Sequence, residues 1–266
     1  MTMSTFLRFK ASLIRTPLQK PATLFAEFLR LPHRLRHPEL KGLFEEPHFL
    51  ELAIRKLNST DSNCIDIGCH IGSVLSVFVK IAPKGNHIAF EPVPDKAAFL
   101  MKKFPDVQVH QVALSDEAGE AEFHEDLSRS GYSSLAKFKD SNAPSVKYRV
   151  KVSKLDDIIP AEHNVNFIKI DVEGAEILVL KGAVRTIDRC RPAIVFENGQ
   201  IGPEKFGFTH ADLFRFVTQT LNYHVFKLRD FIEDQPPLSE EAFHACRIYP
   251  FQAQNFLALP VERYQK

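Results

Sequence analysis

Three carboxylates gather in the segment FIKIDVEGAE, where Asp171, Glu173 and Glu176 surround one glycine. An apolar run interrupted only by Lys169 precedes them. Mutual repulsion and loss of hydration both disfavour like charges at the end of a buried strand. Carboxylates in such a place act as general acids or bases, bind hard metal ions or pair with a cationic ligand. The segment is therefore a candidate for chemistry as well as for a helix start.

A glycine-containing loop, DIGCHIGS, follows an earlier apolar run. Asp66 precedes Gly68 by two residues, and Gly72 follows it by four. Glycines allow a sharp turn and let backbone amides and a helix N-terminus approach a ligand. Glu91 follows the next apolar run, at an interval from Gly68 that suits an acid binding both hydroxyls of a ribose. Together these residues indicate a cofactor that contains adenosine.

The loop spacing favours S-adenosylmethionine over a dinucleotide. NAD sites have the pattern GxGxxG, whereas this chain has GxxxG. Asp66 would repel a pyrophosphate, but it is compatible with a ligand that carries a cationic amino-acid end and no phosphate. A nicotinamide-dependent oxidoreductase is the first alternative, and a non-catalytic binding protein on the same fold is the second.

The elements that must position these residues begin at residue 63, where short apolar runs start to alternate with helical stretches. The predicted strands are CIDIG, HIAFEP, VQVHQVALS, NFIKIDVEG, PAIVFENG, YHVFKL and QAQNFLALP; the helices between them cover SVLSVFVKIA, DKAAFLMKKF, AEILVLKGAVRTI and HADLFRFVTQTL. This alternation predicts an α/β, doubly wound domain with a parallel sheet between helical layers. The more polar AEFHE and VKYRVKVSKLDDII predict a hairpin at one edge or at the ligand end. Ligands bind beyond the carboxyl ends of parallel strands, where the acids and the glycine loop lie.

The first 58 residues predict a separate helical unit, with the main domain over residues 59–266. Residues 1–41 carry eight Lys and Arg against two acids, whereas residues 42–266 carry 26 against 31. Prolines divide this unit into two or three short helices, and one helical face groups Leu24, Phe25, Phe28 and Leu29. We expect a cap on the main domain; weak contact of the basic segment with a membrane surface or a partner is the alternative.

The overall composition excludes several classes of protein. A net charge of +1 gives no reason to expect nucleic acid as a partner. No apolar stretch reaches the roughly 18–20 residues of a membrane span, and no signal peptide is evident. The four cysteines form no CxxC pair, which argues against a disulfide framework and a cysteine zinc site. We therefore expect a cytoplasmic protein with a small-molecule or glycan partner.

Six segments in chain order resemble the FkbM-like S-adenosylmethionine-dependent methyltransferases over about residues 60–200: CIDIGCHIGS, HIAFEPVP, VALSD, GYSSL, VSKLDDI and IKIDVEGAEILVLKGA. The resemblance implies a class I methyltransferase fold, whose mostly parallel seven-stranded sheet has one reversed strand near an edge. It also implies methylation of a substrate oxygen, commonly a hydroxyl of a sugar, a glycolipid or a polyketide-like small molecule.

The resemblance implies a role for each matching residue. Asp66, Gly68, Cys69, His70 and Gly72 would form the cofactor loop, Glu91 would bind the ribose, Ser115 and Asp116 would lie by the adenine, and Asp171 and Glu173 would stand at the methyl-transfer end. Two positions depart from the family pattern. His70 replaces a frequent Asn, and Glu197-Asn198-Gly199 replaces an acid that a His often follows shortly.

Methylation of a hydroxyl is aided by a base, and four residues are candidates: Asp171, Glu173, Glu197 and His70. Burial among like charges raises the pKa of a carboxyl and makes it a better base, which favours Glu173 and Asp171. Glu176 falls in the first turn of the next helix, where a structural role is expected. Asp171 and the pair Glu197-Asn198 also resemble in placement the magnesium ligands of catechol-type methyltransferases, so Mg²⁺ is an alternative to a metal-free site.

Overall fold

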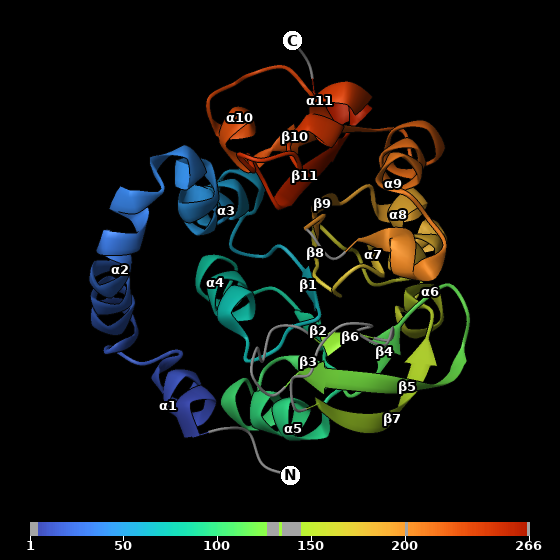
Figure 1. The fold of residues 1–266 in the computed structure, drawn as a ribbon. Coiled ribbons are helices and arrows are strands. Elements are labelled where there is room, and N and C mark those ends of the chain that lie inside the picture. Colours follow the sequence, from blue (N-terminus) through green and yellow to red (C-terminus); the bar gives the residue numbers. More distant parts are fainter. Residues whose placement is uncertain (1–4, 127–132, 135–144, 200–201, 265–266) are drawn as a thin grey trace.

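The computed structural model describes residues 5–126, 133–134, 145–199 and 202–264, and its centre is a seven-stranded sheet (Figure 1). The strand order is β10-β11-β9-β8-β1-β2-β3. The strands are β1 (Cys64–Ile67), β2 (Ile88–Phe90), β3 (Gln108–His110), β8 (Phe167–Ile170), β9 (Ala193–Glu197), β10 (Tyr223–Lys227) and β11 (Asn255–Pro260). All neighbours are parallel except β11, which is antiparallel to both β9 and β10. The predicted fold, including the reversed strand near one edge, is confirmed.

Helices cover both faces of this sheet (Figure 1). One face packs against α3 (Lys41–Leu57), α4 (Ser73–Ile81), α5 (Pro94–Lys103) and α10 (Leu228–Ile232). The other packs against α6 (Leu155–Ile158), α7 (Glu176–Lys181), α8 (Val184–Cys190), α9 (His210–Arg215) and α11 (Glu240–Ala245). Strand side chains alternate between the two cores: Phe167 of β8 belongs to the first and Ile168 to the second. Both faces are buried, which explains why the strands are apolar at nearly every position.

A second sheet contains the predicted hairpin. Its order is β4-β7-β5-β6, from β4 (Ala113–Leu114), β7 (Ser145–Ser153), β5 (Gly119–Asp126) and β6 (Ser133–Ser134). The segment VQVHQVALS, predicted as one strand, is divided between the two sheets, because β3 pairs with β2 whereas β4 pairs with β7. Within GYSSL, only Ser133 and Ser134 belong to the described residues.

The helix predicted over AEILVLKGAVRTI is also divided, into α7 and α8. Gly182 ends α7, and a Cβ there would lie 2.1 Å from the carbonyl oxygen of Ser115. The carbonyl of Gly182 accepts the amide of Asp156. The close packing of other segments around this glycine therefore interrupts a sequence that is helical by periodicity alone. The helix predicted over HADLFRFVTQTL is present as α9, continued by a wider helical turn, η3 (Phe216–Thr220).

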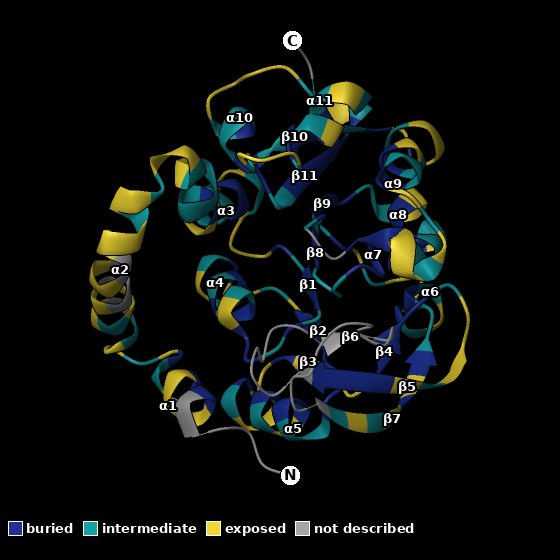
Figure 2. Ribbon diagram, viewed as in Figure 1, coloured by how far each residue is buried: buried dark blue, intermediate teal, exposed yellow. Residues whose placement is uncertain are grey.

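The N-terminal segment is helical as predicted, in α1 (Thr5–Leu13), α2 (Gln19–Arg36), a short turn η1 (Pro38–Leu40) and α3. The prolines divide it less than expected, because Pro32 and Pro47 lie inside α2 and α3. Leu7 and Ala11 of α1 and Ile54 of α3 are buried in the core shared with the sheet, whereas much of α2 is exposed (Figure 2). Across the described ranges, no helix combines the length and apolar character needed to cross a membrane.

Candidate active site

A pocket opens where β1, β2, β4 and β8 end, at the edge of the sheet where ligands of such folds bind. Its polar lining is Gly68, His70, Glu91, Lys96, Asp171 and Glu173; its apolar lining includes Ile67, Phe90, Val112, Ala113, Leu114 and Phe123. The loops after three separate strands therefore contribute to one concave surface. One part of that surface is apolar and another is rich in carboxylates.

Gly68 brings the first loop against the end of β8. Its φ is +78°, and a Cβ at this position would lie only 1.8 Å from the carbonyl oxygen of Asp171. Both facts restrict the position to glycine. The amides of Gly68 and Cys69 donate to the carbonyl of Phe90, at 3.0 and 3.1 Å. These two amides therefore join the loop to β2. The sequence had suggested instead that amides of this loop approach a ligand.

Glu91 joins the glycine loop to the wall of the pocket. Its two carboxylate oxygens accept the amides of His70, at 2.8 Å, and of Val93, at 2.9 Å. Burial raises the pKa of Glu91 to about 7, although the ammonium of Lys96 opposes the shift. His70 has a φ of +53° and also lines the pocket. The structure thus brings together two predicted site residues that are 21 positions apart in the sequence.

Three other predicted loop residues lie behind the pocket surface. Asp66 is buried in β1; burial raises its pKa to about 6, and its Oδ2 has no hydrogen-bond partner among the described residues. Cys69 is buried as well, and burial raises the pKa of its thiol well above the usual value, so the thiol is not reactive at neutral pH. Gly72 has a φ of +82° and starts α4, where a Cβ would meet the ring of Phe104.

Ser115 and Asp116 follow the apolar part of the pocket without lining it. The hydroxyl of Ser115 donates to the carboxylate of Asp116, at 3.2 Å, and its amide donates to the carbonyl of Ser153. The preceding residues, Val112 to Leu114, line the pocket instead. Sequence reasoning missed them because a short apolar run reads as an ordinary strand. The only sequence signal for Val112 to Leu114 was that they directly precede Ser115 and Asp116.

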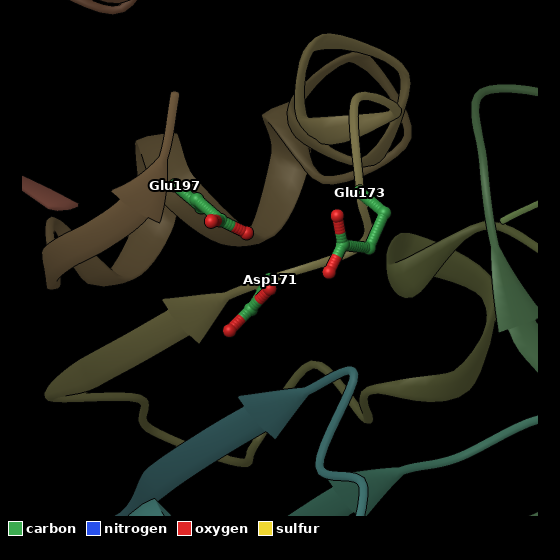
Figure 3. A group of neighbouring side chains, drawn as sticks. All are labelled: Asp171, Glu173 and Glu197. Carbon is green, nitrogen blue, oxygen red and sulfur yellow. The ribbon is translucent and has the colours of Figure 1, made fainter. Parts of the chain in front are cut away.

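Asp171, Glu173 and Glu197 point toward one another at the opposite part of the site (Figure 3). Ile170 pairs with Phe196 in the parallel register of β8 and β9, so Asp171 and Glu197 leave their strands side by side. Glu173 enters from the loop before α7, with a φ of +57°. A carboxylate oxygen from each of the three lies within 4.8 Å of the others. The structure therefore brings together three of the four predicted bases, while the fourth, His70, lines the pocket.

A buried lysine controls the charge of this carboxylate cluster. The Nζ of Lys169 lies 3.2 Å from Oδ2 of Asp171, on the same side of β8 because the two are two residues apart. Burial alone would raise the pKa of Asp171, but Lys169 and a hydrogen bond from Glu197 outweigh it and hold that pKa below its usual value. Burial and the charge of Asp171 raise the pKa of Glu197 well above normal. Asp171 is thus the carboxyl of the pair that ionises first, and Glu197 is the one that retains its proton to higher pH.

Glu173 has a third, different electrostatic environment. Burial, with the charges of Asp171 and Glu176, raises its pKa to about 8. The carboxylate of Glu176 accepts the amides of Val172, at 3.0 Å, and Gly174, at 3.2 Å, on either side of Glu173. The structural role predicted for Glu176 is thus more specific than a helix-start charge. Its carboxylate holds the loop that presents Glu173 in a backbone conformation unusual for a side chain other than glycine.

The geometry bears on the magnesium alternative without requiring a metal. The three carboxylates are hard oxygen donors of the kind that Mg²⁺ prefers. However, Lys169 already places a positive charge beside Asp171. Asn198, the amide proposed as a further ligand, directs its Oδ1 to the ring of His210 instead. Of the three predicted ligands, Asp171 and Glu197 therefore lie together, whereas the amide oxygen of Asn198 is engaged elsewhere.

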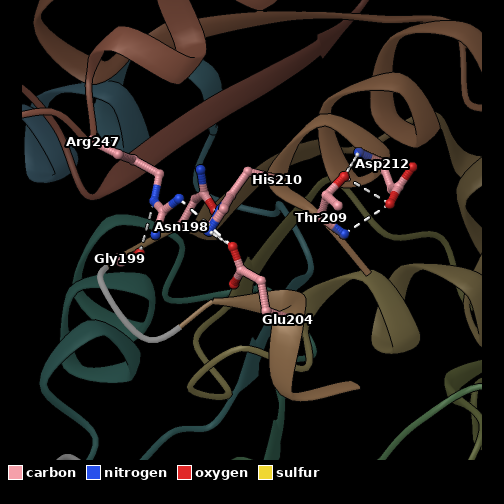
Figure 4. Close-up of polar contacts among 7 residues, drawn as sticks. All are labelled: Asn198, Gly199, Glu204, Thr209, His210, Asp212 and Arg247. Carbon is pink, nitrogen blue, oxygen red and sulfur yellow. Dashed lines mark hydrogen bonds and ion pairs between the residues drawn. The ribbon is translucent and has the colours of Figure 1, made fainter. Parts of the chain in front are cut away.

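His210, the first residue of α9, is buried beside Asn198, which follows β9 (Figure 4). Sequence reasoning missed this residue. Its Nδ1 bonds Oδ1 of Asn198, and its Nε2 lies 2.8 Å from Oε1 of Glu204. Burial, assisted by the charge of Arg247, lowers the pKa of His210 to about 4, so the ring is neutral at physiological pH. Arg247 itself donates to the carbonyl of Gly199, at 3.2 Å. An imidazole thus lies beside Asn198, although the chain has none shortly after Glu197.

The start of α9 positions this imidazole. Thr209 and Asp212 form a reciprocal capping box, in which the hydroxyl of Thr209 accepts the amide of Asp212 and the carboxylate of Asp212 accepts the amide of Thr209 (Figure 4). The box sets the first residue of α9, His210, against β9. The pattern T-x-x-D was the available signal, but it indicates a helix start and not a contact with Asn198.

Comparison with known proteins finds methyltransferases. Residues 66–228, more than half of the chain, match a family model described as methyltransferase FkbM domain. The 2-O-methyltransferase NoeI of Sinorhizobium fredii is 28% identical over 193 residues, which cover 65% of this chain and 74% of that protein. Methyltransferase 1 of Beauveria bassiana is 30% identical over 145 residues, covering 46% of this chain and 58% of the relative.

Solved structures also match. Methyltransferase FkbM from Methylobacillus flagellatus superposes with a TM-score of 0.48 at 17% identity, covering 76% of this chain and 44% of that one, so this chain spans less than half of the crystallised protein. A TehB-like SAM-dependent methyltransferase from Corynebacterium glutamicum superposes with a TM-score of 0.40 at 11% identity, covering 90% of this chain and 97% of that one. On the match of residues 66–228, this chain belongs to the FkbM methyltransferase family.

Proposed function

We propose that this protein is an S-adenosylmethionine-dependent O-methyltransferase whose acceptor is a hydroxyl of a small molecule, a sugar or a glycolipid. One observation carries the proposal: Glu91 and the cluster of Asp171 and Glu173 line the same pocket. A carboxylate suited to a ribose thus shares a cavity with carboxyls suited to proton transfer.

The lining fits S-adenosylmethionine part by part. The apolar wall of Val112 to Leu114 with Phe90 suits an adenine ring. Glu91 retains free lone pairs on both oxygens after accepting its two amides, and these can accept the ribose hydroxyls. Asp171 is ionised and suits a cationic sulfonium and amino group. Among the described residues that line the pocket, the one Lys or Arg is Lys96, and its ammonium is engaged with Glu125 at 2.9 Å, which disfavours a phosphate-bearing ligand.

When bound, S-adenosylmethionine supplies a methyl group on a positively charged sulfur, and transfer to the acceptor oxygen leaves S-adenosylhomocysteine. Glu173 is the residue we assign to the acceptor's proton. Its pKa of about 8 lies near the operating pH, where a general base is most effective. Asp171 has a low pKa and serves to hold the acceptor or the cofactor's charge, and the protonated Glu197 serves to orient Asp171.

Oxygen as the methyl acceptor is supported by chemistry and by one relative. Removing a proton from a hydroxyl as it attacks calls for a base, and the pocket supplies carboxyls whose pKa values are shifted in opposite directions. NoeI, which is similar over 193 residues, is a 2-O-methyltransferase. The substrate class, a hydroxyl-bearing small molecule or glycan, is our inference from these two points. Membership in a methyltransferase family favours methyl transfer over the alternative of a nicotinamide-dependent oxidoreductase.

The proposal is tested in two steps. Calorimetric titration should show binding of S-adenosylhomocysteine, and NADH should bind at least about 100-fold more weakly, a gap of about 2.7 kcal/mol. Tritiated S-adenosylmethionine is then supplied with sugars, oligosaccharides, glycolipids and phenolic or polyketide hydroxyls, and products are identified by mass spectrometry. Formation of a methyl ether, lost in Glu173→Gln, supports the proposal. Tight NADH binding without S-adenosylhomocysteine binding, methylation only at nitrogen, or product formation unchanged in Glu173→Gln would overturn it.

A further inference from the structure

Helix α2 carries its apolar side chains on the outside of the molecule. Phe25, Phe28, Leu29, Leu31 and Leu35 are between 45% and 73% exposed. With Leu18 just before the helix, these positions recur at helical spacing and cover one broad side of α2. Figure 2 shows this helix as exposed along much of its length, at the periphery of the fold. Seven of the ten exposed large apolar residues among the described residues fall between Phe9 and Leu35, so the apolar surface is concentrated here.

Two polar side chains of α2, Gln19 and Arg34, contact the rest of the protein. Gln19 donates to the hydroxyl of Ser76 on α4, at 3.4 Å. Arg34 donates to the carbonyl of Phe44 on α3 and lies over the ring of Phe44. A surface helix of a soluble domain has the opposite orientation, with its apolar stripe toward the core. Among the described residues of α2, the large apolar side chains are therefore exposed, and a second surface would bury them.

The charge of the N-terminal segment, residues 1–41, indicates what kind of surface would cover the apolar residues of α2. Residues 1–41 carry eight Lys and Arg and only two acids. Arg8 and Lys10 of α1 and Arg36 at the end of α2 are exposed. Glu39, one of the two acids, is engaged with His37 and with the hydroxyl of Tyr249. An apolar stripe flanked by cations is the composition of a helix that lies in the interface of an anionic lipid bilayer.

A second copy of this chain is the less favoured occupant. In a two-fold dimer through α2, the same patch would meet itself, and the two basic segments would lie together without compensating acids. Phospholipid headgroups supply the negative charge that a second copy lacks. The 18 residues of α2 give a rod of about 27 Å, long enough to lie flat on the interface with all of the apolar side chains inserted.

We propose that α2 docks the protein on an anionic membrane surface, with Phe25, Phe28, Leu29 and Leu35 entering the headgroup region and Arg8 and Arg36 contacting lipid phosphates. The docking is peripheral, since the apolar residues occupy one side of the helix. Docking does not depend on the proposed methyl transfer, because none of the described residues that line the pocket belongs to α1 or α2.

Sedimentation with vesicles tests the proposal on the full-length protein without cofactor. The probes are vesicles of phosphatidylcholine alone and of phosphatidylcholine mixed with phosphatidylglycerol. The variant Phe25→Ala/Phe28→Ala/Leu29→Ala keeps helix propensity and removes the inserted groups. Met101→Ala/Ile248→Ala is the matched control, because both residues are exposed and lie outside α2. Arg8→Glu/Arg36→Glu tests the charge, and circular dichroism and S-adenosylhomocysteine binding report folding.

The wild type and the Met101/Ile248 control should sediment with the mixed vesicles and much less with phosphatidylcholine alone. The triple variant and Arg8→Glu/Arg36→Glu should each lower the partition coefficient at least about tenfold while remaining folded. Absence of wild-type binding to the mixed vesicles overturns the proposal, as does equal binding by the folded triple variant. Light scattering supplies a separate outcome: a wild-type dimer that the triple variant converts to a monomer, without vesicle binding, would assign the face to a second copy.

Discussion

Lys169 of β8 and Asp171, which directly follows the strand, lie side by side, with Nζ 3.2 Å from Oδ2. The strand period places both side chains on the side of the sheet that also holds Asp66 of the neighbouring β1. A single ammonium thus serves several acids, and it lowers the pKa of both Asp66 and Asp171 relative to burial alone. The acidic segment FIKIDVEGAE thus contains its own counter-ion, Lys169.

Replacing Lys169 with Met should therefore impair the site through charge. Without the ammonium, the pKa values of Asp171 and Glu173 both rise. The acidic limb of the pH-rate profile, which Glu173 sets, therefore moves to higher pH, with kcat reduced at least about tenfold. Lys151→Met is the matched control, since Lys151 is exposed on β7. Methyl transfer is measured from pH 5 to 9. A fall in kcat with an unchanged profile would show that Lys169 acts only in packing.

Glu173→Gln should lower kcat by roughly two to four powers of ten while S-adenosylhomocysteine binds within about threefold of wild type. The wild-type rate should rise as pH increases through about 8, because Glu173 accepts a proton only when ionised and its pKa is raised to about 8. The variant should lose this rise. Glu117→Gln, at an exposed position, is the control. Retention of the rise in Glu173→Gln would assign the base to another group.

Stability without ligand should decrease as pH rises from about 6.5 to 8, above the range in which His210, whose pKa is lowered to about 4, acts in the opposite direction. Burial raises the pKa values of Glu173 to about 8, Glu91 and Glu176 to about 7 and Asp66 to about 6. Because these folded-state values exceed the unfolded ones, the folded chain binds more protons in this window and loses stability as they dissociate. Urea unfolding midpoints measure the effect, and Glu173→Gln should flatten the slope above pH 7. A midpoint that rises over the window contradicts the prediction.

Gly68→Ala should be much more damaging than Gly207→Ala. Both glycines have positive φ, +78° and +80°. A Cβ at Gly68 would overlap the carbonyl of Asp171, whereas one at Gly207 meets nothing within 4 Å. The Gly207 change should cost about 1 kcal/mol from backbone strain alone, and the Gly68 change several times more together with loss of cofactor binding. Comparable unfolding midpoints for the two variants would disprove the close approach of the two loops.

Chelation should leave methyl transfer intact. Lys169 already neutralises Asp171, and Asn198 is bonded to His210, so the proposed chemistry needs no cation. Activity after incubation with EDTA and gel filtration should stay within about twofold of the untreated enzyme. Loss of activity that added Mg²⁺ restores would establish a metal-dependent site at Asp171, Glu173 and Glu197.

Much of the fold could be predicted because apolar periodicity is a local property. Apolar runs such as CIDI and FIKI indicate strands buried on both faces, and their alternation with helices indicates the parallel sheet. The prediction erred where distant segments intervened. Gly182 interrupts a helix because it packs on Ser115, and the segment after β3 changes sheet because β7 pairs with it.

The sequence by itself determined the chemical types at the site. Asp171, Glu197, Gly68 and Glu91 all stand at or just beyond the carboxyl ends of strands. Tertiary structure decided their charge states and roles. Burial and proximity made Asp171 ionised, Glu197 protonated and Glu173 intermediate, although all three are carboxyls. It also turned the apolar side of α2 away from the core. The reason in each case is that pKa and exposure depend on which distant residues surround a side chain, and no local pattern records those neighbours.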